Sequence, residues 1–329
     1  MKMKVLFLAN RESLDRSRFV RNDLEILSRH FQVRPISKQE SELFPVFLAR
    51  LFRGLLVSDV CYVWFSGWAA LYAALFGRIA GTKCVIVPGG FDVADIPQLR
   101  YGYRYSSGWK GRFRLALKMA AAVIPVSDYC RRRLEEEHGI YNSRVIHNGV
   151  DVEKFKCNSP KEPIVLTVAF INKKNIVLKG LEDFLRAASL LPRTDFFIAG
   201  DASEEAVCHL KSKAPANLRL VEGSSIPELY RRAKVYVQAS VVESFGLALA
   251  EAMACECVPV ATERGALPEV AGPEAIYTEY GNPEKLAEAI SRALTLKSGK
   301  VFRQRIIDHF SLEKREEKLI FQIRSLHAG

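Results

Sequence analysis

Short apolar segments alternate with longer amphipathic segments along the whole 329-residue chain. The apolar segments predict strands buried on both faces of parallel sheets, and the segments between them predict covering helices. Predicted helices include Phe19–His30, Asp128–His138, Gly180–Leu191 and Ser225–Arg232. The predicted strands are Val5–Ala9, Gln32–Ile36, Val60–Trp64, Lys83–Val87, Ala122–Val126, Arg144–His147, Pro163–Phe170, Asp195–Ala199, Leu218–Glu222, Val235–Ala239, Val258–Ala261 and Ile276–Tyr277.

The length and one internal turn predict two domains. A chain of 329 residues exceeds the usual size of a single domain. The turn-forming run Asn148-Gly149-Val150-Asp151, followed by polar residues, marks the join. We therefore expect two doubly wound, Rossmann-like α/β domains facing a cleft, in residues 1–152 and 153–307. Residues 308–329 form an amphipathic helix that is expected to pack back on the first domain.

One segment, residues 61–77, has no charge and invites comparison with a membrane span. Ser66-Gly67 interrupts it, with β-formers before the break and alanine and leucine after it. A buried strand followed by a helix is the better interpretation. The first ten residues likewise read as a strand and are too short for a signal peptide.

The seven cysteines show no Cys-x-x-Cys spacing, which favours buried thiols in a reducing cytoplasm. Cys255 and Cys257 are the only closely spaced pair, and no histidine lies near them in the sequence. Asp151-Val152-Glu153 is the nearest approach to a metal-binding Asp-x-Asp, but it lies in the interdomain turn. We predict neither a metal nor a cofactor.

The net charge of +11 is unevenly distributed. Residues up to Glu153 carry 23 basic and 15 acidic side chains (+8), and the rest carry 25 and 22 (+3). The stretch Arg100–Lys118 has six basic residues, no acid and several aromatic residues. This composition predicts either contact with an anionic membrane surface or a solvated loop and helix face.

The run Ser240–Glu251 (SVVESFGLALAE) is the segment most typical of a ligand site. A predicted strand ends just before it, and a helix is predicted to begin near Gly246. The free N–H groups and the positive dipole end of a helix start suit a phosphate. Glu251 would lie about 7.5 Å further along the helix axis, a suitable offset for ribose hydroxyls.

This run resembles the donor-site motif of the retaining family 4 glycosyltransferases, in which two glutamates are separated by seven residues. Glu243 and Glu251 form the pair here. Other family elements agree in order: Leu178-Lys179-Gly180, Phe197–Gly200, Gly223–Leu229, Gly265–Val270 and Ile146–Asp151. The resemblance covers roughly residues 122–325.

The resemblance implies a GT-B glycosyltransferase that moves a hexose from a nucleotide sugar, with retention, and whose donor domain is residues 153–307. Glu243 and Lys179 would serve catalysis, by holding the sugar and by neutralising the leaving phosphates. Glu251 would bind the ribose, and Lys174 or Lys173 would replace a family arginine. The backbone N–H groups of Phe245, Gly246 and Leu247 would bind the diphosphate, and Ser225 and Ile226 would line the base pocket.

The first domain departs from the family on the acceptor side. The usual Gly-Gly after the first strand is replaced by a stretch that contains Arg11, Arg16 and Arg18. A Gly-Gly occurs instead at Gly89-Gly90, followed by Asp92, and the family's cleft histidine has no counterpart. The alternative function is therefore a sugar-nucleotide-binding protein that is weakly active or inactive.

The expected partners are a nucleotide-sugar donor, a lipid-linked or polysaccharide acceptor, and an anionic membrane. Localisation is expected in the cytoplasm, peripherally at the inner face of the cell membrane. A Rossmann dehydrogenase is excluded because Gly-x-Gly-x-x-Gly is missing after the first strand. Nucleic acid is not expected, since the basic excess lies outside any binding motif. Glu269 serves either as a helix cap or in the site.

Overall fold

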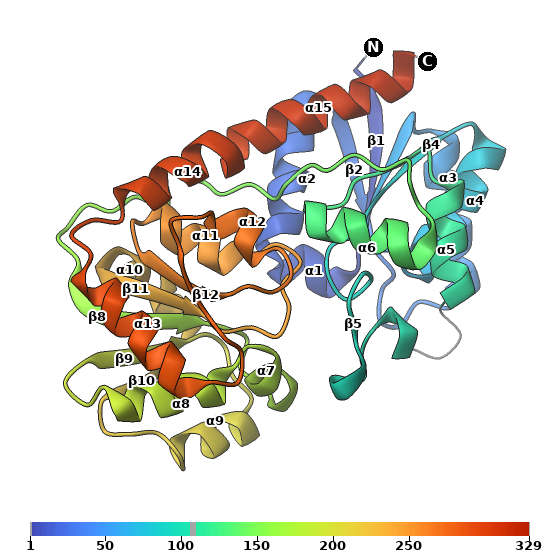
Figure 1. Ribbon diagram of the computed structural model, residues 1–329. Coiled ribbons are helices and arrows are strands. Elements are labelled where there is room, and N and C mark those ends of the chain that lie inside the picture. Colours follow the sequence, from blue (N-terminus) through green and yellow to red (C-terminus); the bar gives the residue numbers. More distant parts are fainter. Residues whose placement is uncertain (1, 106–109, 329) are drawn as a thin grey trace. The chain divides into compact units, whose positions relative to one another are not determined.

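The structure is a computed structural model that describes residues 2–105 and 110–328. The chain forms two compact units, Met1–Gly149 with Leu312–Gly329, and Val150–Ser311. Each unit contains a parallel sheet covered by helices (Figure 1). The predicted pair of doubly wound α/β domains is confirmed. The chain passes from one unit to the other after Gly149 and again after Ser311. The sequence predicts these boundaries after residues 152 and 307.

The first unit is built on a five-stranded parallel sheet of order β2-β1-β3-β4-β7. Its strands are β1 (Lys4–Leu8), β2 (Gln32–Ile36), β3 (Val60–Trp64), β4 (Lys83–Val87) and β7 (Ala122–Val123), with the small antiparallel pair β5 (Asp95–Ile96) and β6 (Tyr101–Gly102). Its helices are α1 (Arg11–Arg16), α2 (Arg18–His30), α3 (Phe44–Leu56), α4 (Trp68–Ala80), η1 (Pro97–Leu99), η2 (Tyr103–Tyr105), α5 (Lys110–Met119), α6 (Asp128–His138) and α15 (Leu312–Ala328).

The direction of the crossovers decides which helices share a face of this sheet. The connection from β1 to β2 runs in one direction along the sheet, and those from β2 to β3, β4 and β7 run in the other. Because such crossovers are right-handed, α2 lies on one face and α3, α4 and α5 lie on the other. Helix α15 packs along α2, whereas α4 contacts both α3 and α5.

The second unit contains a six-stranded parallel sheet of order β10-β9-β8-β11-β12-β13. Its strands are β8 (Glu162–Val168), β9 (Asp195–Ala199), β10 (Leu218–Val221), β11 (Ala233–Gln238), β12 (Val258–Thr262) and β13 (Ile276–Thr278). Its helices are α7 (Lys173–Leu178), α8 (Leu181–Leu190), α9 (Glu204–Lys211), η3 (Gly223–Ser225), α10 (Ile226–Arg232), α11 (Leu247–Ala254), α12 (Leu267–Ala271), α13 (Pro283–Thr295) and α14 (Lys300–Phe310).

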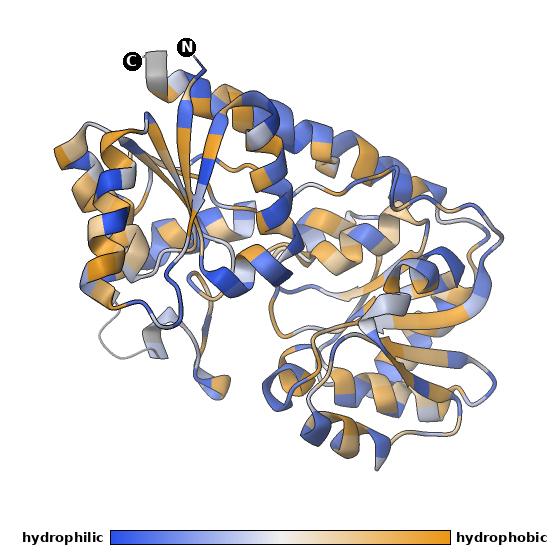
Figure 2. Ribbon diagram, turned by 180° about the vertical axis from the view of Figure 1, so that it is seen from behind, coloured by the Kyte–Doolittle hydropathy of each residue, from blue (hydrophilic) through white to orange (hydrophobic). Residues whose placement is uncertain are grey.

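The apolar pattern located most elements within one or two residues. The strands carry mostly apolar residues, whereas α15 alternates between apolar and polar turns (Figure 2). The uncharged segment 61–77 forms β3 and α4, as predicted. Among the residues that the structure describes, no helix combines the length and apolar character needed to cross a membrane.

The predicted strand Arg144–His147 is wrong. The segment lies beside β7, where the N–H groups of Arg144 and Ile146 donate to the carbonyls of Val123 and Pro125. Pro125 has no N–H to continue the ladder. The carbonyls of Ile146 and His147 instead accept hydrogen bonds from Arg315 Nη1, at 2.8 and 2.7 Å. The segment is therefore extended but belongs to no sheet.

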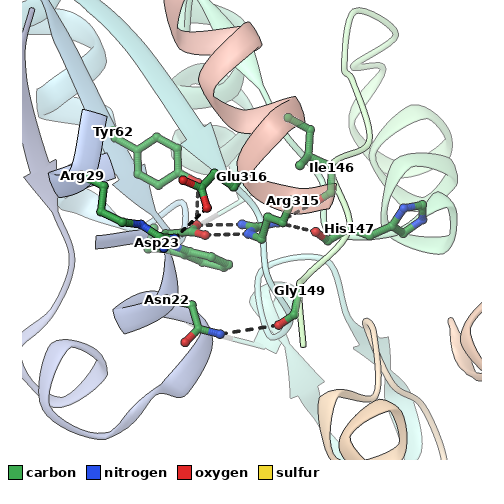
Figure 3. A network of polar contacts seen from close by, with 10 residues as sticks. Asn22, Asp23, Arg29, Tyr62, Ile146, His147, Gly149, Arg315 and Glu316 are labelled. Atoms are coloured by element: carbon green, nitrogen blue, oxygen red, sulfur yellow. Dashed lines mark hydrogen bonds and ion pairs between the residues drawn. The ribbon is translucent and has the colours of Figure 1, made fainter. Parts of the chain in front are cut away.

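Arg315 of α15 forms a fully buried ion pair with Asp23 of α2 (Figure 3). The guanidinium donates from Nε to Asp23 Oδ1 at 2.5 Å and from Nη2 to Oδ2 at 2.7 Å. Asp23 Oδ2 also accepts from the Tyr62 hydroxyl and from Trp64 Nε1, at 2.7 and 2.9 Å. Both charges are 2% exposed or less, and every bond helps to offset their desolvation. The network joins α2, β3, α15 and the segment before Gly149.

Breaking one half of this pair should destabilise the first unit strongly. We expect Arg315→Met to lower its free energy of unfolding by about 3–5 kcal/mol, because the Asp23 carboxylate stays buried without its counter-charge. All three tryptophans of the chain lie in the first unit, so tryptophan fluorescence during urea unfolding reports on that unit.

Two further variants make this prediction specific. Asp23→Leu combined with Arg315→Met should recover part of the loss, because no lone charge remains. Arg29→Met, which removes a more exposed pair between the same helices (Arg29 Nη2 to Glu316 Oε2, 2.7 Å), should cost less than about 1 kcal/mol. Equal losses for Arg29→Met and Arg315→Met would contradict the assignment.

Candidate active site

The second sheet reverses its strand order between β8 and β11. From β8 the chain winds towards β9 and β10, and from β11 it winds towards β12 and β13. Ligands of doubly wound folds bind at the carboxyl ends of the strands beside such a reversal. The segment after β8 leads through α7 to Lys179, and the loop after β11 carries Glu243. The fold therefore brings these two residues to the place where a ligand is expected.

Lys179 and Glu243 are in direct contact. Lys179 Nζ lies 2.5 Å from Glu243 Oε1, with side-chain exposures of 27% and 14%. Lys179 is the C-cap of α7, and Gly180, the N-cap of α8, adopts the left-handed conformation. The pair is thus partly shielded from water yet open on one side, where a phosphate or a sugar hydroxyl would reach it.

Two further side chains hold the same carboxylate oxygen. Glu243 Oε1 accepts from Ser240 Oγ at 2.9 Å and from Gln238 Nε2 at 3.0 Å. Gln238 in turn accepts from the Tyr236 hydroxyl at 2.9 Å. Burial, together with the nearby negative charge of Glu243, raises the pKa of Tyr236 well above its usual value, so its hydroxyl stays a neutral donor.

The sequence reasoning did not name these supporting residues, although a signal was present. Tyr236, Gln238 and Ser240 follow one another at every second position, so they lie on one face at the end of β11. Polar side chains on a face of a buried strand need partners. Their convergence on Glu243 depends on the loop that follows, which periodicity does not describe.

Two glycines allow the backbone to approach the Glu243 loop closely. At Gly265 (φ +62°) an added Cβ would lie 2.2 Å from the Glu243 carbonyl oxygen, and the Ala266 N–H donates to that oxygen at 2.8 Å. At Gly180 (φ +62°) an added Cβ would lie 2.2 Å from the Ala239 carbonyl oxygen. These contacts fix the loop from two sides and give the two glycines of the sequence motif a physical role.

Helix α11 begins beside this loop and carries the second glutamate. Its N-cap is Gly246, so the first turn has no side-chain cap and offers its N–H groups to a ligand. Phe245 is buried with its ring 5.6 Å from Phe310, so only its backbone is available for binding. Leu247 starts the helix, and Glu251 is 4% exposed one turn later.

The remaining predicted residues lie elsewhere on the second unit. Ser225 is exposed and Ile226 half-buried after β10, three strands from β11, or about 14 Å at the usual strand spacing. Lys174 is exposed on α7. Glu269 stands in the first turn of α12, whose N-cap is Ala266, so it is not the capping residue.

The first unit has a buried carboxylate at the corresponding edge of its sheet. Asp92 Oδ1 accepts from the N–H groups of Gly89 and Gly90, at 3.0 and 2.8 Å. Its Oδ2 accepts from the N–H and hydroxyl of Ser66, at 3.2 and 3.0 Å. Burial raises the pKa of Asp92 despite these bonds. The Gly-Gly amides are thus directed at the protein's own carboxylate, which ties the loops after β3 and β4 together.

Both halves of the chain match known glycosyltransferase families. Residues 4–154 match the sequence model described as Glycosyltransferase Family 4, and residues 150–309 match Glycosyl transferases group 1. The fold and these matches define a glycosyltransferase of the GT-B type. Within that class, the chain belongs to the glycosyltransferases that join a family 4 domain to a group 1 domain.

Individual relatives are distant. The phosphatidylinositol N-acetylglucosaminyltransferase GPI3 subunit of Saccharomyces cerevisiae is 27% identical over 197 aligned residues. That alignment covers 53% of this chain and 43% of the yeast protein, so the chain spans less than half the length of this curated relative.

Two solved structures share the fold over nearly the whole chain. The Anabaena protein HepE in complex with UDP and glucose has a TM-score of 0.79 and 18% identity, covering 98% of this chain and all of that one. Sucrose-phosphate synthase from Thermosynechococcus elongatus has a TM-score of 0.81 and 16% identity, with 99% and 100% covered.

The close approach at Gly265 leads to a matched pair of variants. Gly265→Ala should abolish most sugar transfer, because the new methyl group displaces the backbone that carries Glu243. Gly281→Ala is the control, since Gly281 also has a positive φ (+79°) but no atom within 4 Å of an added Cβ. In both variants an alanine must adopt the left-handed conformation, which should lower the free energy of unfolding by about 1 kcal/mol. This loss is measured as a shift in the unfolding midpoint. Equal activity of the two variants would refute the role given to Gly265.

Proposed function

We propose that this glycosyltransferase moves a hexosyl group from a nucleoside diphosphate sugar to a lipid-linked acceptor, with retention of the anomeric configuration. The observation that carries the proposal is the contact of Lys179 with Glu243, 2.5 Å long, at the reversal of the second sheet. An ammonium and a carboxylate held side by side suit a donor that combines anionic phosphates with sugar hydroxyls.

We assign each predicted residue a role in the proposed donor site. The sugar hydroxyls would donate to Glu243, whose orientation Ser240 and Gln238 maintain. The diphosphate would accept from the N–H groups of Phe245, Gly246 and Leu247 and from Lys179. Glu251 would accept from the ribose hydroxyls, Ser225 and Ile226 would contact the base, and exposed Lys174 would approach the phosphates from α7.

The chemistry requires stabilisation of the leaving diphosphate. The bond between the anomeric carbon and the phosphate oxygen breaks, and negative charge grows on that oxygen. Lys179 and the start of α11 would stabilise this charge more in the transition state than in the bound substrate. We propose that these groups supply the positive charge and that no metal is required.

A lipid-linked acceptor is supported by the yeast relative, which is named for transfer to phosphatidylinositol. The larger positive charge of the first 153 residues, +8 against +3, also suits an enzyme working at the inner face of the cell membrane. A polysaccharide acceptor is the alternative, and assays with glycolipid and soluble glycan acceptors would separate the two.

Glu251 provides the test of donor binding. A thermal-shift screen of UDP, GDP and ADP sugars should first identify the donor, because a ligand stabilises the fold by mass action. Glu251→Gln should then weaken its binding by about 1.5–3 kcal/mol in calorimetry, through loss of a charge-assisted hydrogen bond. Unchanged affinity would remove Glu251 from the site.

Lys179 provides the test of catalysis. Lys179→Ala should lower kcat by about 10²-fold or more while changing sugar binding less, because the charge it meets grows during the reaction. Lys211→Ala, which replaces an exposed lysine at the end of α9, is the control and should behave as wild type.

NMR of the product should show the anomeric configuration of the donor, and an inverted product would contradict retention.

A further inference from the structure

The helices α3, α4 and α5 form a layer whose sequence contains no acidic residue. We call them the basic helical layer. They lie on the face of the first sheet opposite α2 and α15. Over the same three helices the sequence places seven basic residues: Arg50, Arg53, Arg78, Lys110, Arg112, Arg114 and Lys118. Arg53, Arg78, Arg114 and Lys118 are exposed.

The same layer exposes large apolar side chains. Ile79 of α4 is 68% exposed and Leu115 of α5 is 49% exposed. In Figure 2, α3 and α4, at the left edge, are mostly apolar with separate polar turns. The exposed apolar residues on or beside the layer are Leu43, Phe44, Val46, Leu56, Val57, Leu75, Ile79 and Leu115. Several large exposed apolar side chains on one helical layer indicate an interaction site.

A row of half-buried aromatic rings runs between α3 and α4. Trp68, Tyr72 and Phe76 follow one another at four-residue spacing along α4, with successive ring centroids 6.2 and 5.7 Å apart. Phe44 of α3 meets Tyr72 at 5.6 Å. The Arg112 guanidinium of α5 lies 3.9 Å from the centre of the Trp68 ring. Aromatic rings flanked by guanidinium groups are typical of the headgroup region of a bilayer.

These observations change the interpretation of the stretch Arg100–Lys118. Tyr103 and Phe113 are 3% and 1% exposed and stack on each other inside the first unit, so they do not reach a bilayer. Trp109, also part of that stretch, lies outside the described residues. The aromatic part of the surface is supplied by α3 and α4, and within the stretch α5 contributes exposed basic side chains and Leu115.

We propose that the basic helical layer docks the enzyme on an anionic lipid bilayer. Charge complementarity favours this occupant, because helices without acidic residues, whose basic and apolar side chains are interleaved, match anionic headgroups above acyl chains. Nearby acids are few: Glu42 is paired with Arg50 at 2.8 Å, Glu40 is exposed before α3, and half-buried Asp59 after α3 accepts from the Lys4 N–H at 2.7 Å. The proposal rests on the lipid-linked acceptor proposed above and assigns the surface that brings the enzyme to it.

Vesicle flotation tests the charged part of the surface. The wild-type chain should float with phosphatidylcholine vesicles that contain phosphatidylserine, and remain unbound with pure phosphatidylcholine or at high salt. Arg78→Ala, Arg114→Ala and Lys118→Ala together should lower the partition coefficient roughly a hundredfold. The control removes the same charge from exposed positions of the second unit: Arg193→Ala, Lys211→Ala and Lys297→Ala.

A second pair of variants tests the apolar part. Ile79→Asn with Leu75→Asn should also reduce flotation, whereas Leu190→Asn with Leu296→Asn, exposed on the second unit, should not. Equal losses for test and control variants, or wild-type binding to neutral vesicles, would overturn the proposal. So would a change of molecular mass in solution caused by the Ile79 variant, since the layer would then join two copies of the chain.

Donor cleavage in the absence of an acceptor, measured as the release of nucleoside diphosphate, distinguishes failure of the docking proposal from failure of the proposed sugar transfer. All test and control variants should retain that activity, because they leave Lys179 and Glu243 intact. If donor cleavage is present and the wild type does not float, the docking surface is wrong and the transfer proposal stands. If the wild type floats and cleaves no donor, the transfer proposal fails alone.

Discussion

One carboxylate oxygen organises the candidate site of the second unit. Glu243 Oε1 accepts from Lys179 at 2.5 Å, Ser240 at 2.9 Å and Gln238 at 3.0 Å. These donors come from the turn between α7 and α8 and from the end of β11, so one atom joins the segments that follow the two central strands. A half-buried carboxylate needs several hydrogen-bond donors to offset its desolvation. The three bonds to Glu243 meet this need and fix the direction of its side chain.

The first unit also buries a carboxylate that needs hydrogen-bond partners, and there an ion pair provides them. Arg315 and Asp23 are almost fully buried, and such a pair contributes little net stability compared with an apolar core. What it does provide is position, because the guanidinium also binds the carbonyls of Ile146 and His147. The C-terminal helix and the segment that leads into the second unit are thus held by one side chain. An apolar residue at position 315 would leave those carbonyls without a donor.

The sequence predicted regular elements well because they depend on local periodicity. β2, β3, β4 and α6 have the predicted bounds, and the motif placed Lys179 and Glu243 in one site before any geometry was known. The supporting partners depend on contacts between distant segments, such as that of Asp23 with Arg315, which are 292 positions apart. Even there a signal existed, since Arg315 lies three residues after Leu312 and four before Leu319, on the apolar stripe of α15. A charge on such a stripe predicts a buried partner without identifying it.

The basic helical layer differs from the surface of the second unit in the acids available to its basic side chains. On the second unit, basic side chains pair with acids: Arg232 with Glu162 at 2.7 Å, and Lys213 with Glu182 at 2.8 Å. Such exposed pairs add little stability, but they neutralise the surface of the second unit. In the basic helical layer, α3, α4 and α5 contribute no acid of their own. A surface that only had to stay in water would gain from mixed charges there and would hide Ile79 and Leu115. The combination of basic side chains and exposed apolar side chains on this layer is explained if a partner supplies negative charge and covers the apolar side chains. The headgroups of an anionic bilayer supply the charge, and its acyl chains cover the apolar side chains.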